Sequence, residues 1–168
     1  MDSLTPPCLT SKRTNIQFLN NQDETLYCSL YTNAKLMKNI SAPLSLSKAG
    51  RSFNAAVKQT HSLDHSHYYF SVRRKNTYDP LGLLSLFTRK NQGEIGILLL
   101  RSAHGKGFPL EILRTLIDYG FNQLELQQIN ANIGHSNKIA HKIAAKLGFD
   151  KITSKDKNSN FSTWLLYP

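Results

Sequence analysis

The chain has 168 residues, of which 21 are Lys or Arg and 11 are Asp or Glu, so its formal net charge is +10. This length fits one domain that can bury a core without disulfides or metals. The contents of 40% hydrophobic and 19% charged residues are typical of a folded globular protein. The longest apolar stretch is far too short to cross a bilayer, and two cysteines make no disulfide framework. We therefore expect a cytoplasmic protein with no membrane contact.

The positive charge is spread evenly along the chain. Residues 1–84 carry ten bases and five acids, and residues 85–168 carry eleven bases and six acids, so each half is +5. Basic proteins often bind nucleic acid or phosphorylated ligands. Because no basic arm or tail concentrates the charge, nucleic-acid binding stays an alternative that charge alone does not favour.

The first half of the chain predicts a strand, two helices and an antiparallel meander. Apolar and polar residues alternate around Ile16 and Phe18, which indicates a strand. Asn21 can cap a helix with acids in its first turn, and Ser47 can cap a second helix over 48–60. Three β-rich runs then follow between turn-like segments, at residues 68–72, 83–87 and 93–100.

The second half changes to alternating helices and strands. Apolar residues recur at helical spacing over 109–124, and Pro109 suits the first helical turn. A strand is predicted over 127–133, then a helix over 137–147, then short strands at 150–153 and 162–167. The inward face of the helix over 137–147 is predicted to hold Ile139, Ala140, Ile143, Ala144 and Leu147. This order beside an antiparallel meander predicts a mixed α/β sheet.

The loop between the third β-rich run and the following helix is rich in small residues. Its sequence is Arg101-Ser102-Ala103-His104-Gly105-Lys106-Gly107-Phe108-Pro109. Backbone N–H groups of such a loop can converge at a helix N-terminus and hold a pyrophosphate. The loop is not a P-loop, because it lacks the Gly-Lys-Ser/Thr ending, and it is not a dinucleotide fingerprint. Taken alone, a Gly-x-Gly turn fits a purely structural role equally well.

The residues around this loop make the pattern more specific. Residues 93–100, the turn over 105–108 and Glu111 in the next helix resemble motif A of the GNAT superfamily of N-acetyltransferases. Residues 129–133, Asn137 and residues 145–149 resemble motif B, so the matching motifs cover 93–149. Within the superfamily, the chain is most similar to the RimJ/RimL-type ribosomal-protein N-terminal acetyltransferases.

The resemblance implies an α/β fold with a mixed, mostly antiparallel central sheet that is splayed at the acetyl-CoA site and flanked by helices. This fold would fill a single domain over residues 1–168. Backbone groups of Leu98, Leu99 and Leu100 are expected to hydrogen-bond the pantetheine of acetyl-CoA. The N–H of Leu99 would then stabilise the oxyanion that forms when an amine attacks the thioester.

The remaining site residues also follow from the resemblance. The loop residues expected to hold the pyrophosphate are His104, Gly105, Lys106, Gly107 and Phe108. Asn137 would bond the pantetheine arm or the thiol, Lys142 would meet the adenosine 3′-phosphate, and Glu94 is the candidate for a water-relayed general base. No metal is expected. Each of three residues also has a purely structural interpretation. Glu94 would be a solvated carboxylate at a strand end, His104 would fill the loop, and Lys142 would belong to a solvated basic helix face.

Several positions depart from the family pattern. His104 stands where Gln or Arg is usual, Pro109 where Gly or Ala is usual, and Ala140 where Ser is frequent. Ala144 replaces the Tyr that many members use as general acid. Loss of that acid is compatible with catalysis, because a thiolate with a free pKa of about 8.5 is a tolerable leaving group.

These observations predict an acyl-CoA-dependent N-acetyltransferase. It would move an acetyl group from acetyl-CoA to a primary amine by direct attack. The acceptor would be a protein or peptide N-terminus, a polyamine or another small amine, and the +10 charge disfavours polycations. A monomer or homodimer is expected. The alternatives are a CoA-binding regulatory module that has lost its general acid, and a basic nucleic-acid-binding domain.

Overall fold

The computed structural model describes residues 8–64, 66–152 and 159–168. These residues form an eight-stranded sheet in the order β1-β2-β3-β4-β5-β6-β8-β7. The strands are β1 Leu9–Thr10, β2 Thr14–Phe18, β3 His67–Arg74, β4 Pro80–Arg89, β5 Gln92–Leu99, β6 Gln128–Gly134, β7 Asp150–Lys151 and β8 Phe161–Leu166. Neighbouring strands pair antiparallel except β5 and β6, which are parallel. The predicted mixed, mostly antiparallel sheet is confirmed.

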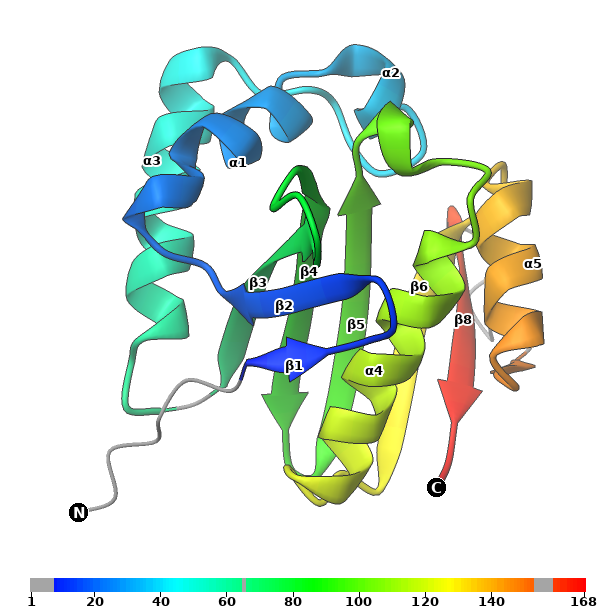
Figure 1. The fold of residues 1–168 in the computed structure, drawn as a ribbon. Coiled ribbons are helices and arrows are strands. Elements are labelled where there is room, and N and C mark those ends of the chain that lie inside the picture. The colour runs from blue at the N-terminus through cyan, green and yellow to red at the C-terminus, as the bar shows by residue number, and fades with distance from the viewer. Residues whose placement is uncertain (1–7, 65, 153–158) are drawn as a thin grey trace.

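Helices cover both faces of the sheet (Figure 1). The helices on one face are α1 Glu24–Tyr31, α2 Ala34–Met37 and α3 Leu46–Thr60, and those on the other are α4 Phe108–Asn122 and α5 Lys138–Lys146. Short 3₁₀ turns precede α1 at Asn21–Asp23 and follow β5 at Arg101–Ala103. The described residues therefore form a three-layer α/β/α sandwich, and the prediction of a sheet flanked by helices is confirmed.

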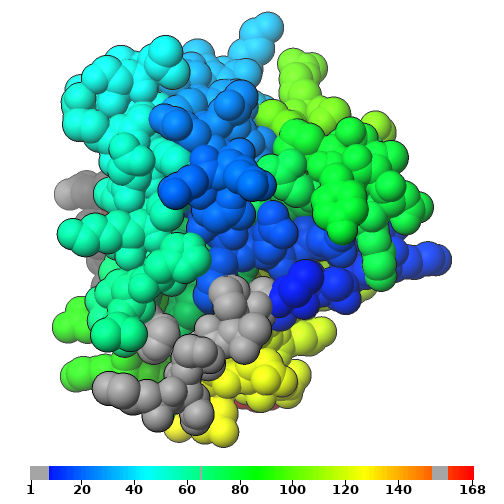
Figure 2. All heavy atoms as spheres, turned by 60° about the vertical axis from the view of Figure 1, so that its left-hand side comes forward, coloured from blue at the N-terminus to red at the C-terminus, as the bar shows by residue number. Residues whose placement is uncertain are grey.

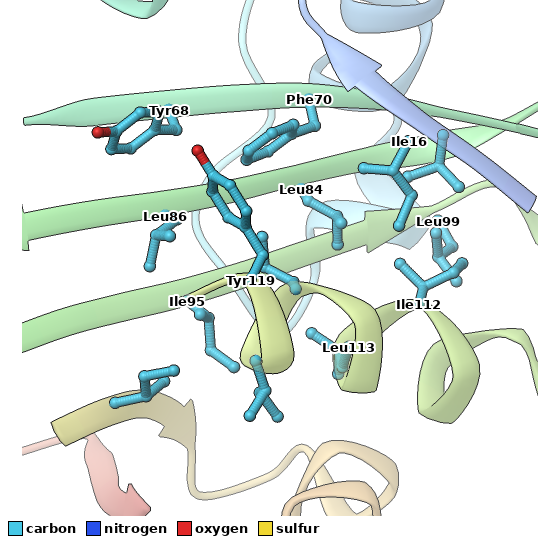
Figure 3. Close-up of a cluster of buried hydrophobic side chains, with 14 of the residues drawn as sticks. Ile16, Tyr68, Phe70, Leu84, Leu86, Ile95, Leu99, Ile112, Leu113 and Tyr119 are labelled. Carbon is cyan, nitrogen blue, oxygen red and sulfur yellow. The ribbon is translucent and has the colours of Figure 1, made fainter. Parts of the chain in front are cut away.

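Alternation along β4 and β5 divides the core into two clusters. Leu84, Leu86, Ile95 and Leu99 point toward α4 and meet residues such as Ile112. Figure 3 shows this cluster, in which Tyr119 of α4 stands against the aromatic rings of β3. Because successive side chains of a strand point to opposite faces, β5 supplies residues to both layers of helices.

The second cluster lies between the sheet and α1 to α3. It contains Leu83 and Leu98 from the sheet together with buried side chains such as Tyr27, Leu30 and Phe53. With this side turned forward, the cyan α3 and the blue α1 lie next to each other over the sheet (Figure 2). The pair covers part of this face of the sheet.

Helix starts differ from the sequence prediction by one or two residues. The turn before α1 is capped by Asn20 rather than Asn21, and Asp23 completes a capping box. Helix α3 is capped by Ser45 rather than Ser47, since Ser45 has extended backbone and its Oγ accepts from the N–H of Lys48 at 3.3 Å. Ser47 lies inside the helix. Each choice was ambiguous because two suitable cap residues lie close together, Asn20 beside Asn21 and Ser45 two positions before Ser47.

Three further differences concern short or peripheral features. Strand β1 and helix α2 were not predicted, because two and four residues are too few to show a period. Ile139 was predicted to face inward but is 73% exposed, because α5 packs through Ala140 and Ala144 instead. Thr153, the end of a predicted strand, lies outside the described residues. No described helix is long and apolar enough to cross a membrane.

Candidate active site

The only parallel ladder among the described strands is short, and its end opens the sheet. Strands β5 and β6 pair at Gln92, Gly93 and Glu94 and at no later residue of β5. Beyond Glu94, β6 continues along β8 while β5 continues along β4. The two halves of the sheet therefore diverge from Ile95 onward, which is the splay that the family resemblance implied.

The register of β5 shows which backbone groups face this gap. The N–H of Leu100 donates to the carbonyl of Leu81 in β4 at 2.8 Å. In an antiparallel ladder bonded and non-bonded residues alternate, so Leu98 also bonds toward β4. Ile97 and Leu99 then direct their backbone groups into the gap. This differs from the expectation that Leu98, Leu99 and Leu100 all face a ligand.

A cleft of about 280 Å³ lies at the divergence of the strands. Its walls come from both faces of the sheet: Leu113 of α4 and Ala144 of α5 on one side, and Tyr31 of α1 and Tyr69 of β3 on the other. Polar side chains in the wall are Asn39, Ser85, Asn132 and Asn137. The cleft passes between the two halves of the sheet, so a ligand in it can be reached from both helical layers.

The Gly-rich loop joins the open end of β5 to α4. Gly105 and Gly107 have φ of 71° and 76°, a conformation that favours glycine. Gly107 is the N-cap of a 15-residue helix, and Pro109 occupies the first turn. The first N–H groups of a helix lack intrahelical partners and lie at the positive end of its dipole. This end of α4 can therefore hold a phosphate group, although Pro109 supplies no N–H.

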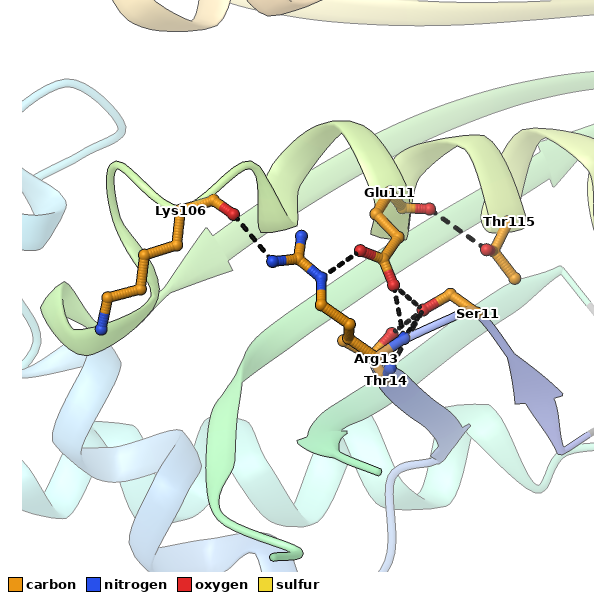
Figure 4. A network of polar contacts seen from close by, with 6 residues as sticks. All are labelled: Ser11, Arg13, Thr14, Lys106, Glu111 and Thr115. Atoms are coloured by element: carbon orange, nitrogen blue, oxygen red, sulfur yellow. Dashed lines mark hydrogen bonds and ion pairs between the residues drawn. The ribbon is translucent and has the colours of Figure 1, made fainter. Parts of the chain in front are cut away.

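A polar network holds the loop from its outer side (Figure 4). Arg13, in the turn between β1 and β2, donates from Nε to Glu111 at 2.7 Å and from Nη1 to the carbonyl of Lys106 at 3.0 Å. Ser11 also donates to Glu111 at 2.5 Å. Burial alone would raise the pKa of Glu111, but the hydrogen bonds from Ser11 and Arg13 outweigh it and hold that pKa below its usual value.

Comparison with known proteins identifies this arrangement. The model of the family described as "Acetyltransferase (GNAT) domain" matches residues 13–150, which include the splayed strands and the Gly-rich loop. The chain belongs to the GNAT acetyltransferase family. The family predicted from the two motifs is thereby confirmed.

Relatives of this GNAT domain resemble it over most of the chain. The uncharacterized N-acetyltransferase p20 of Bacillus licheniformis is 29% identical over 148 residues, 85% of this chain and 82% of that protein. An acetyltransferase from Agrobacterium tumefaciens has the same fold with a TM-score of 0.84 at 16% identity, covering 100% of this chain and 98% of the other. RimL, a ribosomal alpha-N-protein acetyltransferase in complex with coenzyme A, gives 0.82 at 12% identity, covering 96% and 98%. At these identities the two solved structures show that the chain shares their fold.

Two of the predicted site residues lie close to the GNAT cleft with part of their bonding capacity already used. His104 turns its Nε2 to the carbonyl of Leu99 at 3.1 Å, so only Nδ1 remains for a phosphate. Asn137 lines the cleft and caps α5 through Oδ1, which accepts from the N–H of Ala140 at 3.1 Å. Its Nδ2 is the group that could reach a ligand. Both ligand contacts stay predictions.

The other predicted side chains lie at the edges of the site. Glu94 stands where β5 and β6 stop pairing and accepts from Nδ2 of Asn130 at 3.4 Å. Lys142 is exposed on α5, and Lys106 directs its Nζ to the carbonyl of Ser102 at 2.9 Å. The general-base role of Glu94 and the phosphate role of Lys142 stay predictions. Among the described residues, no three His, Cys, Asp or Glu side chains gather into a metal site.

Sequence reasoning missed three residues of this site. Tyr31 and Tyr69 line the cleft on the side of α1, and burial raises the pKa of both hydroxyls, so they stay protonated at neutral pH. Arg13 was missed because its partner Glu111 is 98 residues away. No sequence motif marks the two tyrosines. The role of Arg13 could have been predicted only if the position of Glu111 in space had been known.

Proposed function

We propose that residues 1–168 act as one acetyltransferase domain that moves an acetyl group from acetyl-CoA to a primary amine by direct attack. The observation that carries the proposal is the open edge of β5, where Ile97 lines the cleft and the N–H of Leu99 faces away from β4. An amide-containing arm such as pantetheine can pair with such an edge as a short strand does. Residues 93–149 supply the cofactor contacts in this proposal.

Groups of this chain can be assigned to each step of the proposed reaction, from cofactor binding to proton transfer. The loop and the N-terminus of α4 hold the pyrophosphate, and Nδ2 of Asn137 positions the arm near the thiol. The N–H of Leu99 donates to the oxygen that becomes negative as the amine attacks. Glu94 lies outside the cleft wall, at the last pair of the β5–β6 ladder, so it takes the proton of the amine only through water, and the thiolate leaves without a dedicated acid.

The acceptor amine enters in this proposal from the side of α1. Tyr31, Asn39, Ile40 and Tyr69 line that side, and the cleft wall holds no Asp or Glu among the described residues. A polyamine needs carboxylates near its second charge, and the net charge of +10 repels it further. We therefore favour an acceptor with one charged amine, which is a protein or peptide N-terminus or a small monoamine.

The setting of the reaction follows from the same reasoning. Cys8 is exposed and Cys28 is buried, and both are free thiols, which fits the reducing cytoplasm. We place the enzyme there, as a monomer or homodimer.

Binding comes first in the test of this function. Acetyl-CoA should raise the melting temperature of the protein by mass action. Thiol release should then be measured over N-terminal peptides, small monoamines and polyamines, with peptides or monoamines expected to react fastest. No thermal shift at saturating acetyl-CoA would reject the cofactor.

Two rival functions have their own signatures. A tight complex with no turnover on any amine would support a regulatory module, for which the apolar Ala144 in the cleft wall is the motivating observation. Binding to RNA that weakens steeply with salt would support the nucleic-acid alternative.

A further inference from the structure

The guanidinium of Arg13 is held on three sides beside the Gly-rich loop. Its Nε donates to Glu111, its Nη1 donates to the carbonyl of Lys106, and its Cζ lies 4.3 Å from the centre of the buried ring of Phe108. The outer side of Gly107 is covered as well, because a Cβ there would lie 3.6 Å from Nη2 of Arg13. The position of this side chain is therefore fixed relative to the loop.

The contact with Lys106 sets the orientation of one peptide group. The carbonyl of Lys106 and the N–H of Gly107 belong to the same planar peptide, which is trans, so they point in opposite directions. Since the carbonyl turns toward Arg13, the N–H of Gly107 turns to the opposite side of the loop. That side is where the first N–H groups of α4 would meet an anion.

The charge of Arg13 itself contributes little at a distance. Its side chain is 44% exposed, so water and salt screen it, and its nearest carboxylate neutralises it. A direct geometric role is better supported than a long-range electrostatic one. Lys could keep the charge but not the planar fork that bonds a carboxylate and a carbonyl in two fixed directions.

We propose that Arg13 is a positioning residue that orients the peptide between Lys106 and Gly107 so that the N–H of Gly107 binds the pyrophosphate of the acyl donor. This inference rests on the proposed function, because it takes coenzyme A as the ligand of the loop. Arg13 touches neither the thioester nor the amine in this proposal, so it acts on cofactor affinity and not on the chemical step.

The test is calorimetric titration of the whole chain with CoA and with 3′-dephospho-CoA, which keeps the pyrophosphate. Arg13→Gln and Arg13→Lys should each lower the affinity for both ligands about tenfold. This is the loss expected for one hydrogen bond to a charged group. Arg74→Gln is the matched control. The substitution removes the same charge, and Cζ of Arg74 lies 5.1 Å from the centre of the same Phe108 ring. Arg74 does not hydrogen-bond the carbonyl of Lys106, which accepts from Arg13, so Arg74→Gln should bind both ligands with wild-type affinity.

A second control separates peptide orientation from general anchoring of β1. Ser11→Ala removes a hydrogen bond to Glu111 but leaves the bond from Arg13 to Lys106. Ser11→Ala should not lower the affinity for CoA. Circular dichroism should show that each variant is folded. Wild-type affinity in Arg13→Lys would overturn the geometric role in favour of charge. The proposal would also be overturned if Ser11→Ala lowered CoA affinity as much as the Arg13 variants do. It would be overturned too if the Arg13 variants lost affinity for CoA but not for 3′-dephospho-CoA.

Failure of the proposed function looks different from failure of this inference. A wild type that binds no CoA rejects both. A wild type that binds CoA, with both Arg13 variants binding equally well, rejects only the role of Arg13.

Discussion

Gly82 is the position where a single added methyl group should disturb the site most. It lies in β4 opposite Leu99, with a φ of +157°. A Cβ at this position would overlap the carbonyl oxygen of Leu98 and lie 2.7 Å from Cα of Leu99. Both obstacles belong to the backbone of β5 and not to a flexible side chain, so Gly82→Ala must move the strand that carries the proposed oxyanion donor.

The size of the effect follows from these contacts. Overpacking against fixed atoms costs about 1–3 kcal/mol, and a backbone angle that suits only glycine adds about 1 kcal/mol or more. We therefore expect Gly82→Ala to lower the free energy of unfolding by about 3 kcal/mol. With a urea slope of about 2 kcal/mol per molar, the midpoint falls by about 1.5 M.

The assay is urea unfolding followed by circular dichroism, with Gly50→Ala as control. Gly50 lies inside α3, and a Cβ there meets only Oε1 of Glu24 at an ordinary 3.8 Å. This control should stabilise the protein by about 0.5–1 kcal/mol through helix propensity. Folded Gly82→Ala protein should also bind CoA more weakly. Unchanged stability and unchanged CoA affinity in Gly82→Ala would refute the close approach of β4 and β5.

Three other substitutions test separate parts of the structure. Asp23→Ala should cost about 3 kcal/mol of unfolding free energy in urea, because it leaves Arg73 without its fully buried partner at 2.8 Å, and a cost under 1 kcal/mol would contradict the buried pair. Ser71→Ala should raise the unfolding free energy by about 1 kcal/mol, since its buried Oγ has no hydrogen-bond partner among the described residues, and a loss of stability would reveal one. Glu111 has a pKa below its usual 4.5, because hydrogen bonds led by that from Ser11 outweigh burial, so its contribution is present above pH 4.5 and is lost as the pH falls through the lowered value. Unfolding measured from pH 6 to pH 3 should show a weaker acid dependence in Glu111→Gln, and identical slopes would disprove the linkage.

Long periodic segments were predictable from sequence, and short ones were not. The helix predicted over 109–124 is α4, Phe108–Asn122, because its apolar stripe repeats over four turns and Pro109 marks its start. Helix α2 has four residues and is capped by Asn33, so its position depends on contacts and not on a pattern. Ile139 shows the limit of periodicity, which indicates an apolar stripe but not how wide a strip of the helix is covered.

The position of the Gly-rich loop was predictable because local sequence determines it. A Gly-rich turn before a helix indicates an anion-binding loop from its own residues, and the loop lies where the motif placed it. The direction of the β5 amides could not be predicted, because it depends on the register with β4, and a register one residue different would exchange the directions of Leu98 and Leu99. The contact of Arg13 with the loop brings together residues 93 positions apart, which no spacing reveals.

The short ladder between β5 and β6 also determines which parts of the sheet can unfold separately. Strands β1 to β5 form one continuous antiparallel unit, β6, β8 and β7 form another, and three residue pairs of the described chain join them. Amide hydrogens of β6 and β8 should therefore exchange with solvent through partial openings that leave β3 and β4 protected. A ligand that fills the gap would fasten the two units, so its binding should be visible as slower exchange far from the atoms it touches.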